Sequence, residues 1–101
     1  MCGINGAFDN NFDQNAAINQ MKQMNGLIKH RGPDSDGIYF DDGFCLGHTR
    51  LSIIDVSNNA DQPMISSDGR FIIAFNGEIY NFQELSKFLV NEFSIKPRTS
   101  S

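Results

Sequence analysis

The spacing of apolar residues changes along the chain, and this limits the folds that it can form. Over residues 14–29 the apolar side chains recur every three or four positions, which predicts an amphipathic helix with Asp13 at its N-cap. Over residues 38–76 the apolar runs are short and rich in β-branched and aromatic residues, which predicts strands. Helical spacing returns after Asn81, where Glu84 three residues later predicts a capping box.

Strands are predicted at four places, namely residues 2–8, 38–40, 44–51 and 71–76. The turn at residues 41–43 joins the second and third of these into a β-hairpin. Residues 31–37 are predicted as a loop from their Gly, Pro and Asp content, and residues 55–69 as an irregular connection with a short strand. Strands flanked by helices indicate an α+β fold built in layers.

Composition restricts the class of protein. A chain of 101 residues, 40% of them hydrophobic, fits one small domain over residues 1–101. The net charge is −4 and the eight Lys and Arg residues are scattered, so we expect no nucleic-acid partner. No apolar run is long enough to span a bilayer and no leader precedes Cys2, so we expect a cytoplasmic protein without membrane contact and with reduced thiols.

A thiol at the second position suggests nucleophilic catalysis. Removal of Met1 would leave Cys2 with its own α-amine beside the sulfur, and an amine of ordinary pKa can act as a base near neutral pH. The side-chain amide of Asn76 and the backbone N–H of Gly77 could form an oxyanion hole. These groups together would suit attack on an amide.

Two charged residues indicate the substrate. The guanidinium of Arg50 can grip a carboxylate with two hydrogen bonds, and Glu78 can hold an ammonium group, so an amino acid is the expected substrate. Glu78 as a solvated loop charge is the alternative. His48 shares a strand face with Arg50, either helping to shape the pocket or serving as a structural histidine. Cys45 is expected in the core, and no metal site is predicted.

Five segments in order carry a family resemblance: MCGI at residues 1–4, RGPD at 31–34, GHTRLSIID at 47–55, QPM at 62–64 and FNGEIYNF at 75–82. With these, the chain resembles the glutaminase domain of glutamine-hydrolysing asparagine synthetases, which are class II glutamine amidotransferases. The resemblance implies the N-terminal nucleophile hydrolase fold, a four-layer α-β-β-α sandwich. The family's domain is longer than this chain, so residues 1–101 would form its N-terminal half, with the synthetase domain absent.

The resemblance also implies residue roles. Cys2 would be the nucleophile, with Asn76 and Gly77 as oxyanion donors. The glutamine site would comprise Arg50, Leu51, Ser52, Ile53, Ile54, Asn76, Gly77 and Glu78. L-Glutamine and an ammonia-accepting synthetase domain are the implied partners, and ATP and Mg²⁺ are implied for that domain alone.

The implied function is hydrolysis of the glutamine amide, which supplies ammonia for ATP-dependent asparagine synthesis in the full-length enzyme. Two alternatives stay open: an amidotransferase with another acceptor such as a sugar acid, and a non-catalytic binding or assembly fragment of the same fold. Half a sandwich would leave sheet edges and apolar faces uncovered, so we expect self-association, and the fragment could be inactive by itself.

Overall fold

The computed structural model describes residues 2–11, 13–52 and 57–98. Its largest sheet is antiparallel, has the strand order β1-β3-β2, and consists of β1 (Gly3–Phe8), β2 (Ser35–Asp41) and β3 (Phe44–Arg50). The predicted strand at residues 2–8 and the hairpin are both confirmed. Gly43, with φ of 89°, supplies the left-handed backbone conformation that the hairpin turn needs.

The strand β2 begins earlier than predicted, and the loop prediction is wrong for residues 35–37. Ser35 lies opposite Arg50 and Asp36 opposite Thr49 in the antiparallel register. Pairing with a neighbouring strand therefore outweighs the turn-forming composition of this segment. On the other side of β3, Gly3 lies opposite Thr49, so the start of β1 and the end of β3 meet at one end of the sheet.

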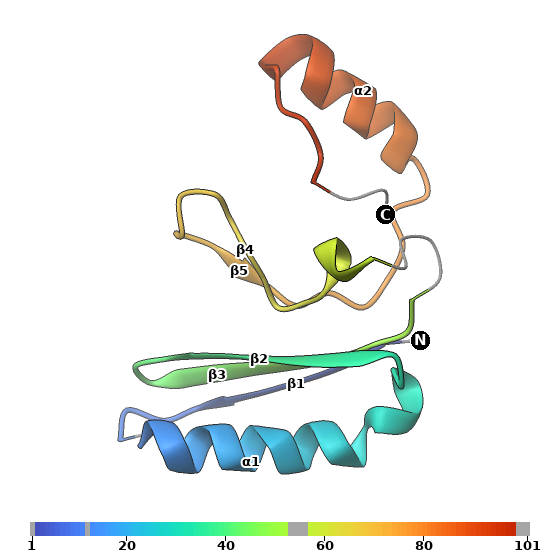
Figure 1. Ribbon diagram of the computed structural model, residues 1–101. Helices are drawn as coiled ribbons and strands as arrows, with labels where there is room; N and C mark the ends of the chain where they lie inside the picture. Colours follow the sequence, from blue (N-terminus) through green and yellow to red (C-terminus); the bar gives the residue numbers. More distant parts are fainter. Residues whose placement is uncertain (1, 12, 53–56, 99–101) are drawn as a thin grey trace.

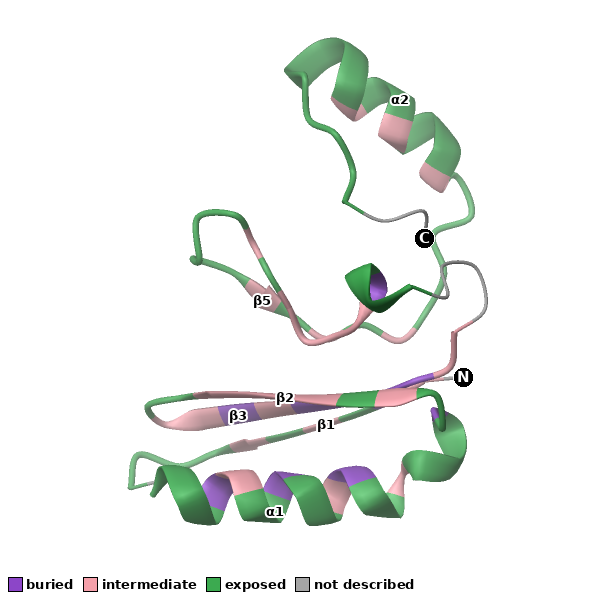
Figure 2. Cartoon of the chain, in the orientation of Figure 1, coloured by how far each residue is buried: buried purple, intermediate pink, exposed green. Residues whose placement is uncertain are grey.

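The helix α1 (Gln14–Leu27) covers one face of this sheet, as Figure 1 shows. The predicted N-cap is confirmed, because the Asp13 carboxylate accepts a hydrogen bond from the Ala16 N–H at 3.0 Å. The helix ends two residues before the predicted boundary and is followed by a 3₁₀ turn, η1 (Lys29–Arg31). Ala17 and Met21 of α1 form the core with Cys45 of β3. Figure 2 shows buried residues, in purple, on both α1 and β3.

A polar pair of amides lies within the contact between α1 and the sheet. Asn25 is 1% exposed, accepts a hydrogen bond from Asn5 Nδ2 at 2.6 Å and donates one to the Gly37 carbonyl at 3.2 Å. A side chain at position 47 would collide with the oxygens of both amides, so Gly47 gives them their space. Sequence periodicity predicts an apolar interior here, and these two amides depart from it.

A second, smaller set of elements lies on the other face of the sheet (Figure 1). It comprises the 3₁₀ turn η2 (Asn58–Ala60) and the antiparallel strands β4 (Met64–Ile65) and β5 (Ile72–Ile73). The short strand expected within residues 55–69 is confirmed. The predicted strand at residues 71–76 is shorter than expected. Its partner among the described residues is the two-residue β4, and a strand can form hydrogen-bonded pairs only along the length of its partner.

The helix α2 (Phe82–Phe93) confirms the second predicted helix. Asn81 occupies the N-cap position but its side chain makes no capping hydrogen bond, so the predicted capping box is wrong. The backbone of Asn81 has φ of −99° and ψ of 30° rather than the extended conformation that directs a cap side chain back to the helix. No residue of α2 is buried.

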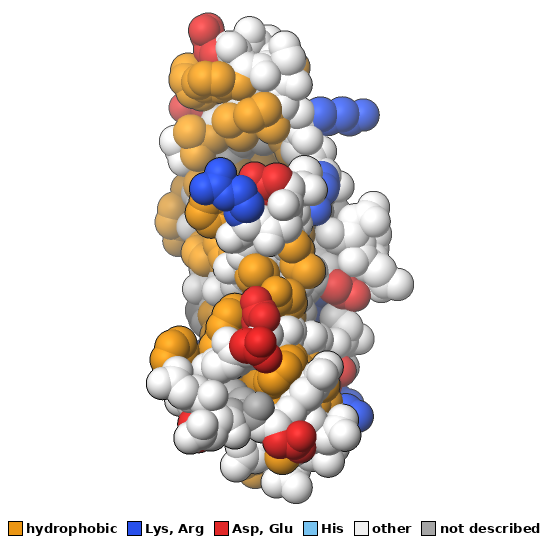
Figure 3. All heavy atoms as spheres, turned by 90° about the vertical axis from the view of Figure 1, so that its left-hand side faces the viewer, with side chains coloured by type: hydrophobic (Ala, Val, Ile, Leu, Met, Phe, Trp, Pro, Cys, Tyr) orange, Lys and Arg blue, Asp and Glu red, His pale blue; other side chains and the backbone are white. Residues whose placement is uncertain are grey.

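Apolar side chains remain exposed on α2 and on the β4–β5 segment. Figure 3 shows hydrophobic side chains over α2 at the top of the molecule and along the middle of the same face. Phe71 is 66% exposed and Phe93 59%. The described residues thus combine two α-helices with antiparallel sheets, which agrees with the α+β prediction. Among them, no helix is long and apolar enough to cross a bilayer.

Candidate functional site

The Cys2 thiol lies next to the backbone of Leu51. Because β1 and β3 are antiparallel, the residue before β1 faces the residues that follow β3. The Leu51 N–H donates to Cys2 Sγ at 3.3 Å, and the Cys2 thiol is 3.9 Å from the Leu51 carbonyl. Arg31 Nε donates to the Cys2 carbonyl at 3.4 Å. The thiol is half-buried at the end of the sheet that also carries Arg50.

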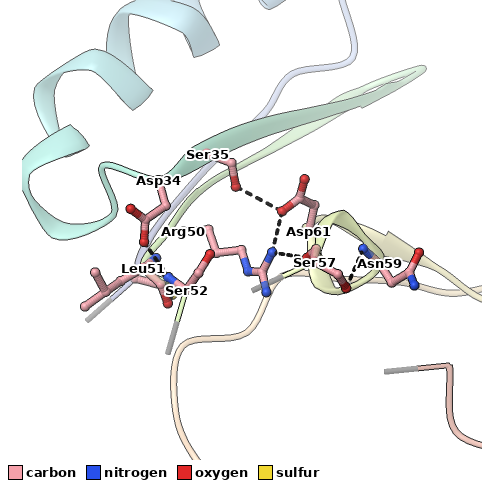
Figure 4. A network of polar contacts seen from close by, with 9 residues as sticks. Asp34, Ser35, Arg50, Leu51, Ser52, Ser57, Asn59 and Asp61 are labelled. Atoms are coloured by element: carbon pink, nitrogen blue, oxygen red, sulfur yellow. Dashed lines mark hydrogen bonds and ion pairs between the residues drawn. The ribbon is translucent and has the colours of Figure 1, made fainter. Parts of the chain in front are cut away.

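Arg50 is the last residue of β3 and its side chain is 7% exposed. Nη1 donates to Asp61 Oδ1 at 2.7 Å and to the Ser57 carbonyl at 2.6 Å (Figure 4). Asp61 Oδ1 also accepts a hydrogen bond from Ser35 Oγ at 3.0 Å. A guanidinium with so little exposure needs a compensating carboxylate, which Asp61 supplies. Asp61 was not predicted from the sequence, where its signal is merely that of a carboxylate in the connection that follows Arg50.

A cavity of about 330 Å³ opens beside this ion pair. Asp34 closes one side, and its Oδ2 accepts a hydrogen bond from the Ser52 N–H at 2.6 Å (Figure 4). The cavity is lined by Asp34, Ser35, Arg50, Ser52, Asn58 and Asp61. The cavity thus places one guanidinium between two carboxylates, which are the charges that complement the carboxylate and the ammonium of a zwitterion.

The segment from Asn76 to Glu78 follows β5. Asn76 is half-buried, whereas Gly77 and Glu78 are exposed. Among residues 2–11, 13–52 and 57–98, no hydrogen bond connects Asn76, Gly77 or Glu78 to Cys2. The structure therefore brings Cys2, Arg50, Leu51 and Ser52 to one end of the sheet, and no hydrogen bond joins the predicted oxyanion donors to Cys2 within the described residues.

His48 connects this segment to the sheet. It is 0% exposed, on the same face of β3 as Arg50, and its Nε2 lies 3.3 Å from the Phe75 carbonyl. Burial lowers the pKa of His48, partly offset by the Phe75 carbonyl, so the ring is neutral at physiological pH. The other described thiol, Cys45, is 1% exposed in the core, as predicted, and burial raises its pKa.

Several predicted features fall outside the described residues. Ile53 and Ile54, both predicted to line the glutamine site, belong to this group, as does Met1. Within the described part of the chain, no cluster of three His, Cys, Asp or Glu side chains could hold a metal ion.

Comparisons with known proteins give a consistent result. A family model described as a glutamine amidotransferase domain matches residues 1–101. Asparagine synthetase [glutamine-hydrolyzing] 1 of Bacillus subtilis (strain 168) is 48% identical in an alignment 94 residues long, which covers 88% of this chain and 14% of that protein. Asparagine synthetase B [glutamine-hydrolyzing] of Escherichia coli (strain K12) is 44% identical over 85 residues, 84% of this chain and 15% of that protein.

A plant relative matches the whole chain. Asparagine synthetase [glutamine-hydrolyzing] 1 of Arabidopsis thaliana is 38% identical over 101 residues, which cover 100% of this chain and 17% of that protein. The chain thus spans 14 to 17% of the length of these relatives.

Proposed function

The chain belongs to the glutamine amidotransferase domain family, and from this premise we propose that Cys2 is the nucleophile that hydrolyses glutamine. The thiolate attacks the side-chain amide, ammonia leaves, and water then hydrolyses the thioester to glutamate. The α-amine freed by removal of Met1 is the proposed base. In the full-length protein the ammonia would serve ATP-dependent synthesis of asparagine, with ATP and Mg²⁺ acting in a synthetase domain.

The observation that carries this proposal is the position of the thiol beside the residues that follow Arg50. The Leu51 N–H reaches Cys2 Sγ at 3.3 Å, and Arg50 immediately precedes Leu51. A substrate whose α-carboxylate binds near Arg50 would therefore lie within reach of the sulfur. Asp61 already holds Arg50 Nη1, so the substrate carboxylate must displace Asp61 or bind beside it.

The ammonium group of the substrate has more than one candidate partner. Glu78 is the residue that the sequence and the resemblance suggest, and it stays a prediction. Asp34 and Asp61 are carboxylates in the same cavity as Arg50, which supports a role for them in binding the ammonium. Asn76 and Gly77 remain the proposed oxyanion donors, and Ile53 and Ile54 remain proposed glutamine-site residues.

The proposed fold is the four-layer α-β-β-α sandwich, of which residues 1–101 form a part. The order of α1, the three-stranded sheet, the β4–β5 strands and α2 in Figure 1 supports it. The exposed apolar side chains on α2 are also in line with a larger domain, because a helix with one apolar face normally buries that face.

The decisive experiment replaces Cys2→Ala in the full-length protein and measures glutamate release and ammonia-dependent asparagine synthesis separately. We expect glutamine hydrolysis to disappear while synthesis from added ammonia continues. Cys45→Ala is the matched control, because it removes the buried thiol outside the site and should retain glutamine hydrolysis. Glutamine hydrolysis by Cys2→Ala would refute the proposal. Synthesis with a sugar acid but not with aspartate would identify the alternative acceptor.

A further inference from the structure

The backbone of Phe75 is held from both sides by side chains of other segments. Its N–H donates to Gln62 Oε1 at 2.5 Å, and its carbonyl lies 3.3 Å from His48 Nε2. Gln62 comes from the connection before β4, and His48 comes from β3. Two elements distant in sequence therefore fix the peptide groups on either side of one residue.

Only one tautomer of His48 can form a hydrogen bond with the Phe75 carbonyl. A carbonyl oxygen cannot donate, so Nε2 must carry the proton and donate to Phe75. The Nδ1 atom is buried and has no hydrogen-bond partner within the described part of the chain. A neutral, fully buried imidazole thus directs its only N–H at the Phe75 carbonyl, at the cost of leaving Nδ1 unsatisfied.

The contact between His48 and the Phe75 carbonyl restricts the backbone of residues 76 and 77, which follow it. The Phe75 carbonyl and the Asn76 N–H belong to one planar peptide unit, so fixing the carbonyl also fixes the peptide plane from which the Asn76 side-chain amide and the Gly77 N–H, the two proposed donors, continue. The ring of Phe75 additionally packs against Gly77, where an added Cβ would lie 3.0 Å from the ring. Phe75 therefore constrains both Asn76 and Gly77.

We propose that His48 is a positioning residue for glutamine hydrolysis: through the Phe75 carbonyl it orients Asn76 and Gly77 as oxyanion donors. This inference rests on the proposed function, because Asn76 and Gly77 matter only if an oxyanion forms at Cys2. Within the described residues no hydrogen bond joins His48 to Cys2, and the proposed effect of His48 is confined to the geometry of the donors. Gln62 assists by holding the Phe75 N–H.

A positioning role predicts a specific kinetic pattern. Donors that stabilise the oxyanion act in the transition state, so their misalignment lowers kcat and leaves KM nearly unchanged. Loss of one oxyanion donor typically lowers kcat about 10²- to 10³-fold. For donors that are displaced but still present we expect a smaller decrease, about 10- to 10²-fold.

The test compares His48→Leu with His48→Gln in the full-length protein. Leu removes the N–H, whereas the Gln side-chain amide can donate to the Phe75 carbonyl again. We expect kcat for glutamine hydrolysis to fall about 10- to 10²-fold in His48→Leu, with KM within about threefold of the parent, and to recover at least in part in His48→Gln. His30→Leu is the matched control, because His30 is exposed and outside the site, and it should retain the parent kcat.

A second measurement separates this inference from the proposed function. Hydrogen exchange at the Asn76 and Gly77 amides reports their ordering whether or not the protein hydrolyses glutamine. We expect faster exchange at both amides in His48→Leu and not in His30→Leu. Unchanged exchange, or an unchanged kcat in a protein whose Cys2→Ala variant is inactive, would overturn the role of His48. If His48→Leu does not fold, the same two measurements are made on Gln62→Leu, which removes the hydrogen bond to the Phe75 N–H.

Discussion

The two α-helices of the described chain differ in an instructive way. The helix α2 is the more strongly amphipathic, yet none of its residues is buried, whereas α1 buries Ala17, Met21 and Asn25. The apolar face of α1 lies on a three-stranded sheet, and that of α2 has no comparable surface among the described residues (Figure 2). Periodicity therefore predicts which face of a helix will be buried, but not whether a surface exists to cover it.

The strands show the same contrast. In the β1-β3-β2 sheet the central strand β3 has neighbours on both sides, and Cys45, Gly47 and Thr49 are buried under α1. The pair β4–β5 consists of two-residue strands and exposes Ile65 and Ile73. A two-stranded ribbon of this length contributes little stability by itself. The stability of the chain should therefore reside mainly in the α1 side.

The largest expected effect is on the free energy of unfolding, and it compares the contribution of α1 with that of α2. Met21→Ala removes a side chain that is 1% exposed, and we expect a loss of about 2 to 5 kcal/mol in the free energy of unfolding. Leu85→Ala on α2, where Leu85 is 42% exposed, should cost about 1 kcal/mol or less. Denaturant unfolding of the 101-residue chain measures both. Equal losses would mean that α2 packs in solution as firmly as α1.

A second prediction concerns the ion pair between Arg50, at the end of β3, and Asp61, in the connection before β4. Asp61→Ala removes the carboxylate that accepts from Arg50 and leaves a nearly buried guanidinium less well compensated. We expect a loss of about 1 to 3 kcal/mol, below that of a fully buried pair, because the Asp61 side chain is 39% exposed. Ser35→Ala, which removes only the hydroxyl contact to Asp61, is the matched control and should cost about 1 kcal/mol. A smaller loss for Asp61→Ala than for Ser35→Ala would contradict this assignment.

The sequence predicted the elements whose signals are local. The N-cap of α1 was predictable because Asp13 acts on a backbone N–H three residues away, and the hairpin because its turn lies between two apolar runs. Contacts between distant segments were not predictable in this way. The pairing of Arg50 with Asp61 and of His48 with Phe75 depends on the path of the connection after β3, which carries no periodic signal.

The limits of strand prediction have the same origin. Residues 71–76 have high β-propensity, but propensity reflects the fit to a neighbouring strand, and β4 offers only two residues. Conversely, residues 35–37 have turn-forming composition and still join β2, because β3 is long enough to pair with them. The thiol of Cys2 was predicted as the nucleophile from its sequence position, whereas its contact with Leu51 follows from the register of β1.

A third prediction compares the two helix N-termini. Asp13→Ala removes a side-chain hydrogen bond to the Ala16 N–H, and we expect a cost of about 1 kcal/mol. Asn81→Ala should change the stability by less than about 0.5 kcal/mol, because the Asn81 side chain makes no capping hydrogen bond. Thermal unfolding of both variants provides the measurement. A substantial loss in Asn81→Ala would show that α2 acquires a cap in solution.

The smallest expected effect is the contribution of His48 to the pH dependence of the chain's stability. Burial lowers the pKa of His48 in the folded chain, whereas in the unfolded chain the imidazole has its ordinary pKa of about 6.5. Between these two values the unfolded chain binds more protons, so the stability is complete above about pH 6.5 and falls as the pH decreases toward the folded pKa.

Both charged neighbours enter this balance, because Arg50 opposes protonation of His48 and Asp61 favours it. Unfolding followed from pH 7.5 to 5 should therefore show a loss of stability that is absent from His48→Gln, whose side chain does not titrate. Asp61→Asn should extend the loss to lower pH, since it removes the charged neighbour that favours the protonated ring. Identical pH profiles for the parent and His48→Gln would mean that the imidazole is hydrated in solution and that its N–H is not reserved for Phe75.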